Sequence, residues 1–168
     1  MAESLVIRSV TSGDAAAIAA IYNPYIRATT VSFEEEDVTA EVMAGRIAAA
    51  TAHYPWLVLE LGDRVIGYAY ARKYHERAAY RHTVETAIYL HAGLHRQGYG
   101  RLLYGALLAQ LPALGVRSAI GGISWPNPGS IGLHEAMGFV KVGHFPQIGF
   151  KFGDWIDVVY LQKCFETP

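Results

Sequence analysis

The stretch His95-Arg96-Gln97-Gly98-Tyr99-Gly100-Arg101 joins an apolar run typical of a strand, Thr86 to Leu90, to an amphipathic run typical of a helix, Leu102 to Leu111. A glycine turn that leads into a helix leaves backbone N–H groups without partners, and the helix dipole adds partial positive charge there. Gly98 and Gly100 also allow positive φ and a close approach of the main chain to a ligand. The stretch therefore predicts a site for a phosphate-bearing ligand, while the same glycines would also suit a plain strand-to-helix turn.

Two common phosphate motifs do not fit this turn. The G-x-G-x-x-G/A spacing of dinucleotide-binding folds is not met by the residues that follow Gly98, and there is no Walker lysine. The ligand must therefore be held in another way than in those folds.

The segments around the turn alternate between strand and helix patterns. A helix capped by Ser12 or Asp14 is expected to run through Tyr22 until Pro24 disturbs it. Gly62-Asp63 predicts a β-hairpin turn, and Gly138 a helix C-cap. The expected strands cover residues 5–8, 56–61, 64–71, 82–91, 117–123, 139–144 and 155–164, and the other helices cover 38–53, the run after the glycine turn to near Gly115, and 127–137. Pro146 and Gly149 fall at expected boundaries.

Composition limits the classes of protein. With 168 residues, of which 52% are hydrophobic, the chain suits one globular domain over residues 1–168. Apolar runs fall short of the roughly 18–20 residues that span a bilayer. The net charge of −1 gives no indication of nucleic acid or an anionic membrane as partner. A lone cysteine, Cys164, offers no internal disulfide and no metal spacing, so we expect a cytoplasmic protein without a bound metal.

Charge is unevenly distributed along the chain. Residues 72–101 contain six basic side chains against two acidic ones, Glu76 and Glu85. Residues 34–41 are acidic, which is typical of a solvated turn and helix start, and we assign that run no chemistry.

Two polar residues, Glu85 and His134, have two interpretations each, and a third, Asn127, has one. Glu85 in an apolar strand is either on a solvated face or a general base near the ligand. His134 in an apolar helix is either a hydrogen-bonded core residue or a catalyst. Asn127, which opens that helix, is at the least an N-cap.

Together these features resemble a known family. The strand, the HRQGYGR turn, the helix, and the segment from Asn127 to Phe139 are similar to the GNAT superfamily of acetyl-CoA-dependent N-acetyltransferases. Tyr22-Asn23, Thr83-Val84-Glu85, the GLHEAMGF segment and the KFGDW segment resemble its phosphinothricin and methionine sulfoximine (sulfone) acetyltransferase branch. The resemblance implies an α/β (α+β) single-domain GNAT fold, with a mixed central sheet of about seven strands and about four flanking helices.

The resemblance also implies a site for acetyl-CoA as co-substrate. Its pyrophosphate would lie on the turn, at Arg96, Gln97, Gly98, Tyr99, Gly100 and Arg101, and its pantetheine arm along Ile88, Tyr89 and Leu90, with Asn127 near the sulfur end. Family members usually have Gln or Arg where this chain has His95.

The implied substrate is a small amino acid or analogue, such as phosphinothricin, methionine sulfoximine or methionine sulfone. Its pocket would include His75, Glu76, Arg77, Arg81, Glu85, Thr86 and Ala87, with Arg77 or Arg81 pairing with the substrate anion. Transfer would be direct, in a ternary complex. Glu85 would take the proton of the amine, directly or through water, and His134 would protonate the leaving thiolate or assist Glu85. Backbone N–H groups near Ile88 and Tyr89 would stabilise the oxyanion.

Two other functions fit the same features. One is acetylation of a protein N-terminus or another amine, and the other is acetyl-CoA binding without catalysis. The resemblance further implies a homodimer, for which the aromatic C-terminal third would suit an interface and would equally suit a core.

Overall fold

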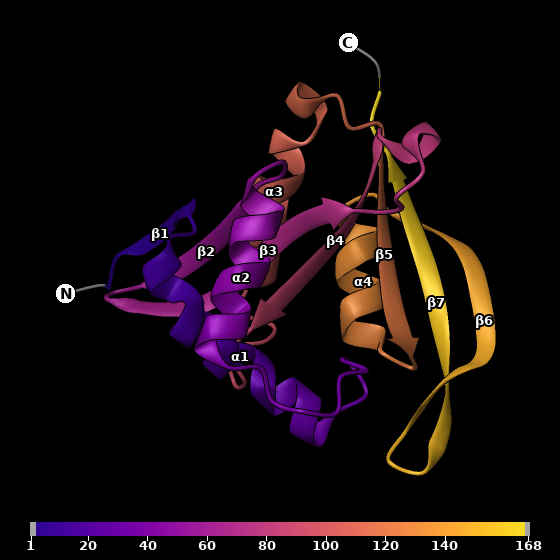
Figure 1. The fold of residues 1–168 in the computed structure, drawn as a ribbon, viewed down its shortest axis with the longest axis horizontal. Coiled ribbons are helices and arrows are strands. Elements are labelled where there is room, and N and C mark those ends of the chain that lie inside the picture. Colours follow the sequence, from indigo (N-terminus) through magenta and orange to yellow (C-terminus); the bar gives the residue numbers. More distant parts are fainter. Residues whose placement is uncertain (1–2, 167–168) are drawn as a thin grey trace.

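A mixed seven-stranded sheet runs through residues 3–166, the part of the chain that the computed structural model describes (Figure 1). The strand order is β1-β2-β3-β4-β5-β7-β6, and every neighbouring pair is antiparallel except β4 and β5. The strands are β1 (Leu5–Ser9), β2 (Trp56–Leu61), β3 (Arg64–Lys73), β4 (Thr83–Leu90), β5 (Ser118–Trp125), β6 (Val140–Lys151) and β7 (Asp154–Cys164). One domain over residues 1–168 stays a prediction, and residues 1–2 and 167–168 lie outside the described part.

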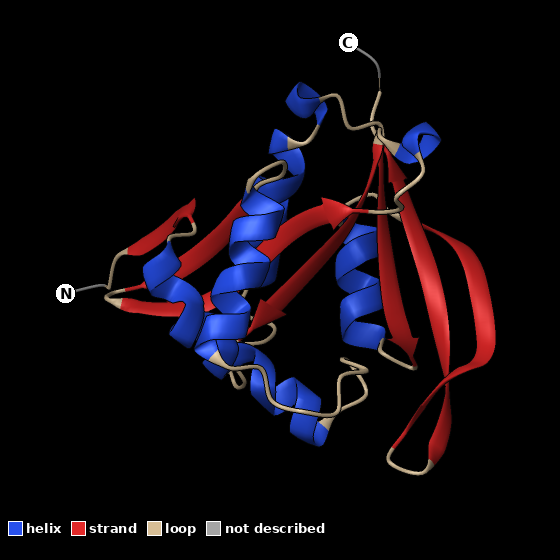
Figure 2. Cartoon of the chain, in the orientation of Figure 1, coloured by secondary structure: helices blue, strands red, loops and turns tan. Residues whose placement is uncertain are grey.

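Four α-helices cover the sheet (Figure 2). They are α1 (Ala15–Ala28), α2 (Ala40–Thr51), α3 (Tyr99–Gln110) and α4 (Pro128–Ala136). Helices α1 and α2 pack in one core, whereas α3 and the apolar side chains of α4 pack in another. The mixed sheet and the four helices confirm the predicted fold class.

Strand alternation builds both cores from the same strands. On β2, Leu57 and Leu59 belong to the core under α3, while Trp56 and Val58 belong to the core under α1 and α2. Because successive side chains of a strand point to opposite faces, a strand covered on both sides is apolar throughout. The central strands are therefore held from both faces, which gives a rigid frame for polar groups at their ends.

Three local predictions are confirmed. Gly62 turns the β2–β3 hairpin with φ of +61°, and Gly138 follows α4 with φ of +90°. Asn127 is the N-cap of α4, since its side-chain oxygen accepts from the Ser130 N–H at 3.2 Å. Short-range sequence signals were sufficient in these places because each structure depends on one residue's own conformational range or side chain.

The prediction that Pro24 interrupts the first helix is wrong. Helix α1 continues through Pro24 to Ala28. The carbonyl that a proline leaves without an N–H partner belongs to Ala20, which is exposed to water. Beyond the proline, Ile26 is buried and the Tyr25 hydroxyl donates to the Leu90 carbonyl. Tertiary contacts therefore hold the last turn.

The boundaries expected at Pro146 and Gly149 are also wrong, because both residues lie within β6. The ladder between β6 and β7 is irregular between Phe145 and Gly149, and this irregularity accommodates Pro146 without a lost ladder bond. Strand β6 is also an edge strand of the sheet, where proline is tolerated.

Candidate active site

A cleft opens where β4 and β5 separate. The two parallel strands pair only at Thr83–Ser118, Val84–Ala119 and Glu85–Ile120, and then diverge (Figures 1 and 2). The cleft between them has a volume of about 1020 Å³. Its walls come from β3, β4, β5, α4 and β7, and from α1, the loop that follows it, and α2. The fold therefore brings residues from distant parts of the sequence around one opening in the sheet.

The glycine turn follows β4 directly. Gly98 is the N-cap of α3 with φ of +86°, and Arg96 also has positive φ, at +62°. Helix α3 begins at Tyr99, earlier than the apolar run suggests, so the first-turn N–H groups of α3 belong to the turn itself. Gly100 is buried against α4, because a Cβ there would lie 3.3 Å from Leu133 Cδ2. The turn is thus next to the helix that carries Asn127 and His134.

The predicted cofactor residues divide into two groups. Ile88, Tyr89 and Asn127 line the cleft. Leu90 and residues 96–101 are not among its lining residues and continue from its end, where β4 leads into α3. His95 Nε2 lies 3.1 Å from the Tyr25 hydroxyl, so this residue ties the turn to α1.

His134 is buried, and both of its ring nitrogens have partners. Nδ1 lies 2.8 Å from the Ser130 carbonyl oxygen, which can only accept, so Nδ1 carries the proton. Nε2 then accepts from the Tyr104 hydroxyl at 3.1 Å, and Tyr104 in turn lies 2.7 Å from Thr86 Oγ1. Burial lowers the pKa of His134, which favours the neutral ring. The predicted catalyst is therefore part of a buried hydrogen-bond chain at the cleft wall.

Glu85 lies on the other side of the sheet from this chain. Thr86 reaches Tyr104 on the α3 side, so the side chain of Glu85, one residue earlier, points toward α1 and α2. Its carboxylate pairs with Arg72 across the strands, with Oε1 at 2.9 Å from Nη2 and Oε2 at 3.2 Å from Nε. The Glu85 side chain is one-third exposed. Both Glu85 and His134 line the cleft, but they approach it from opposite faces.

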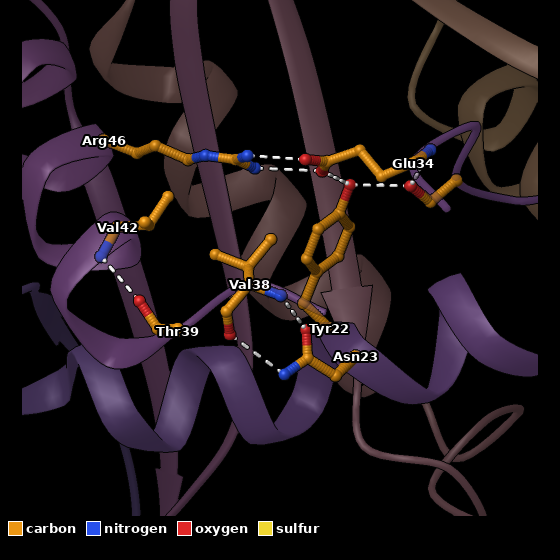
Figure 3. A network of polar contacts seen from close by, with 8 residues as sticks. Tyr22, Asn23, Glu34, Val38, Thr39, Val42 and Arg46 are labelled. Carbon is orange, nitrogen blue, oxygen red and sulfur yellow. Dashed lines mark hydrogen bonds and ion pairs between the residues drawn. The ribbon is translucent and has the colours of Figure 1, made fainter. Parts of the chain in front are cut away.

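A second acidic group enters the cleft from the loop after α1. Figure 3 shows Glu34 between Arg46 of α2 and Tyr22 of α1. Arg46 donates to both carboxylate oxygens, at 2.5 and 2.9 Å, and the Tyr22 hydroxyl also donates to Glu34. These bonds with Arg46 lower the pKa of Glu34, and burial raises the pKa of Tyr22 to about 12. Asn23 bonds the backbone N–H and carbonyl of Val38 in the same region (Figure 3).

Sequence reasoning missed three residues of this side of the cleft. They are Glu34, Arg46 and Arg72, all of which line it. The interpretation of residues 34–41 as a solvated turn and helix start does not fit Glu34, which is paired with Arg46 and lines the cleft. No local pattern in the sequence marks these residues, because each is brought to the cleft by a different element.

The loop between β3 and β4 carries several predicted substrate residues. His75, Glu76, Arg77 and Arg81 are exposed and are not among the residues that line the cleft. Arg81 donates to the Ala78 carbonyl at 3.1 Å, and Glu76 pairs with Lys73 at 2.7 Å. Thr86 and Ala87, by contrast, do line the cleft. A substrate role for the loop stays a prediction.

Two further features bear on the chemistry. Residues 3–166 contain no group of three or more His, Cys, Asp or Glu side chains arranged to hold a metal ion. Among the helices of this same part, none has the length and apolar character to cross a membrane.

Comparison with known proteins places this geometry in context. The domain model "Acetyltransferase (GNAT) domain" matches residues 7–160. The chain is 39% identical to a phosphinothricin N-acetyltransferase of Streptomyces viridochromogenes, over 96% of this chain and 88% of that protein. It is 33% identical to an L-methionine sulfoximine/L-methionine sulfone acetyltransferase of Salmonella typhimurium, over 94% and 93%.

A solved structure agrees with the fold. It is that of a putative acetyltransferase from Salmonella typhimurium with its cofactor acetyl-CoA. The TM-score is 0.95 at 31% sequence identity, and the match covers 98% of this chain and 96% of the other.

Proposed function

Since the chain belongs to the GNAT acetyltransferase family, we propose that it transfers the acetyl group of acetyl-CoA to the α-amino group of a small amino acid or analogue. Phosphinothricin, methionine sulfoximine and methionine sulfone are the substrates to which the names of its relatives point. The observation that carries the proposal is the cleft between the diverging strands β4 and β5, which has two arginine–glutamate pairs on the α2 side and the glycine turn at its end.

Acetyl-CoA fits the main chain at this end of the cleft. The ladder between β4 and β5 stops at Glu85, so the backbone groups of Ile88 to Leu90 that face away from β3 are not paired with a strand. Of these groups, the Leu90 carbonyl accepts from Tyr25, and a pantetheine arm could bond along the rest. The first-turn N–H groups of α3, preceded by Gly98 in a left-handed conformation, suit the pyrophosphate. When bound, acetyl-CoA would supply an activated thioester carbonyl, and Asn127 would lie near its sulfur end.

The acceptor would enter from the α1–α2 side. Arg72 and Arg46 are cations in this wall of the cleft, and each is paired with a carboxylate of the protein, Glu85 and Glu34 respectively. The guanidinium donors outside these pairs, on Nη1 of Arg72 and Nε of Arg46, would bind the carboxylate or phosphinate of the substrate. Glu85 then takes a proton from the substrate ammonium, directly or through water, so that the nitrogen can attack. Arg72 fixes this carboxylate in the cleft while leaving part of it exposed to the substrate.

Proton transfer to the leaving sulfur would involve the other wall. His134 is neutral with Nε2 accepting from Tyr104, so it acts as an acid only after taking up a proton at Nε2. N–H groups near Ile88 and Tyr89 would stabilise negative charge that develops on the carbonyl oxygen, an effect worth about 3–4 kcal/mol where it has been removed in other enzymes. No nucleophilic side chain is needed for direct transfer in a ternary complex.

A thiol-release assay tests this function against its rivals. The wild-type protein is given acetyl-CoA with phosphinothricin, methionine sulfoximine or methionine sulfone, and in parallel with peptides that begin in Ala or contain Lys. The proposal expects CoA release with at least one of the amino acids and a much lower kcat/KM with the peptides. Faster turnover of peptides would favour a protein acetyltransferase, and acetyl-CoA binding without turnover of any amine would favour a sensor.

We also propose that the protein is a cytoplasmic homodimer. Support for the dimer comes from the hairpin of β6 and β7, whose exposed apolar side chains are Val140, Val142, Phe145, Ile148, Phe150, Phe152 and Trp155. Strand β6 is at the edge of the sheet, where such side chains favour association unless they are covered. A second copy of the chain is the partner that would cover them.

A further inference from the structure

The ammonium group of Lys151 is buried at the end of β6. Its side chain belongs to the KFGDW segment, to which neither the cofactor nor the acceptor chemistry assigns a role, and only 2% of the residue is exposed. Nζ donates to three backbone carbonyls, at 2.7 Å to Ile26, 2.8 Å to Thr29 and 2.7 Å to Ser32. An ammonium has three donors, so all of them are used on one short segment more than a hundred residues away.

This segment is the end of α1 and the loop that follows it. Ile26 is in the last turn of α1, where carbonyls have no helical partner and a positive charge is favourable. Thr29 and Ser32 continue the chain beyond the helix. Three bonds from one rigid point restrict both the direction in which the chain leaves α1 and the path of the loop.

The same loop forms one wall of the cleft. Ser32, Phe33 and Glu34 line it, and the Ser32 hydroxyl lies 2.7 Å from the Tyr22 hydroxyl and accepts from the Glu34 N–H at 3.1 Å. From one side, Tyr22 and Arg46 hold the Glu34 side chain (Figure 3). From the other side, Lys151 holds the backbone carbonyl of Ser32.

Strand β6 makes a second contact with this loop. Gly149 lies against the Phe33 ring so closely that a Cβ would be 2.4 Å from Phe33 Cε2. Gly149 and Lys151 are two residues apart on the strand, so both point toward the loop. Strand β6 therefore contacts both a side chain of the loop, that of Phe33, and the backbone carbonyls of the loop.

We infer that Lys151 is a positioning residue for acceptor binding, which sets the place of Phe33 and Glu34 in the cleft through the loop backbone. The inference rests on the proposed function for its kinetic part only. Lysine is required because methionine would keep the length and apolar volume of the side chain but would leave three carbonyls without a donor.

The test compares Lys151→Met with Lys141→Met, which removes an exposed lysine from the same strand. For Lys151→Met we expect the KM for the amino acid to rise by about tenfold or more, while the KM for acetyl-CoA changes by less than about twofold. Lys141→Met should leave both values unchanged. A general loss of structure would raise both constants together or reduce the amount of active enzyme, and would not separate them.

A second variant covers the case in which Lys151→Met fails to fold by circular dichroism. Gly149→Ala keeps Lys151 and displaces the Phe33 ring, so it should show the same separation of the two KM values. Unchanged amino-acid KM in the folded variants, or an equal rise in both constants, would overturn the inference.

Hydrogen exchange separates this inference from the proposed function. Amides of residues 29–34 should exchange faster in Lys151→Met than in the wild type, while those of residues 99–104 should not change. Exchange at 29–34 equal to the wild type would refute the positioning role whatever the enzyme acetylates. Faster exchange at 29–34 in Lys151→Met, together with a wild type that acetylates no amino acid, would support the role of Lys151 in the loop and refute the proposed function.

Discussion

At the scale of single residues, His134 shows how burial determines the state of a titratable group. The residue is 4% exposed, and its ring donates to Ser130 and accepts from Tyr104. The folded protein therefore favours the neutral form, and the pKa is lowered mainly by desolvation. Both interpretations of this histidine fit the structure in part, because it is a hydrogen-bonded core residue that also borders the cleft.

The lowered pKa predicts a stability change with pH. Between the unfolded pKa of about 6.5 and the lower folded pKa, the unfolded chain binds a proton at this site and the folded chain does not, so the free energy of unfolding falls as pH decreases. In His134→Gln, this decrease in the free energy of unfolding with falling pH should disappear. Urea unfolding at a series of pH values measures it, and His53→Gln, at an exposed histidine, is the control. An unchanged slope in His134→Gln would contradict the assignment.

Glu85 is the proposed base, and its replacement gives a kinetic prediction. Glu85→Gln keeps the size of the side chain but removes proton acceptance, so kcat should fall by at least about tenfold with little change in acetyl-CoA affinity. Glu135→Gln, on an exposed face of α4, is the matched control. Steady-state rates across pH measure both. Full activity of Glu85→Gln over that range would exclude Glu85 as the base.

Two pairs of arginines are alternative candidates for binding the anionic group of the substrate. Arg46 and Arg72 line the cleft, whereas Arg77 and Arg81 are on the exposed loop. Arg46→Met is expected to raise the KM for the amino acid about tenfold, because one charge-assisted pair is lost, and Arg81→Met should raise it much less. The reverse order in the same assay would return the anion site to the loop predicted from sequence.

At the scale of secondary-structure elements, the contact between β5 and α4 depends on a glycine. A Cβ at Gly121 of β5 would lie 2.7 Å from His134 Nε2, so Gly121→Ala must displace the imidazole and break its bond to Tyr104. We expect a loss of about 1–3 kcal/mol in the free energy of unfolding. Gly132→Ala, in open space on α4, should instead stabilise by about 0.5–1 kcal/mol. Denaturant unfolding compares the two, and equal effects would refute the contact.

Elements were predictable from sequence where a local rule decides them. The hairpin at Gly62, the cap at Asn127 and the end of α4 at Gly138 each depend on neighbouring residues. Pro24 and Pro146 were misjudged because contacts with distant parts of the chain, or an irregular ladder, compensate for the missing N–H. A local rule gives the stability that a helix or strand loses at a proline, but it does not reveal the distant contacts that offset this loss.

At the scale of the whole molecule, the cleft results from topology. Strand β4 keeps its pairing with β3 as it leaves β5, and the gap collects side chains from helices on both faces. Glu85, His134 and the turn could be predicted because each lies within a local sequence motif of its own. Glu34, Arg46 and Lys151 could not, since each is bonded to a partner that only the folded chain brings close.

The exposed face of β6 and β7 predicts self-association. Phe150 and Trp155 are cross-strand neighbours whose rings lie 5.0 Å apart, and both are more than half exposed. Light scattering should give twice the mass of one chain for the wild type. Phe150→Ser combined with Trp155→Ser should shift it toward one chain, whereas Val42→Ser, at an exposed valine of α2, should not. A monomeric wild type at micromolar concentration would contradict the dimer.

Product analysis tests the central claim most directly. The wild-type protein is incubated with isotopically labelled acetyl-CoA and phosphinothricin or methionine sulfoximine, and the position of the label is determined by NMR. The account predicts label in an amide on the α-nitrogen of the amino acid, with stoichiometric release of CoA and a rate lowered by Glu85→Gln. Label that remains in acetyl-CoA with every small amino acid, while a peptide N-terminus or lysine becomes acetylated, would contradict it.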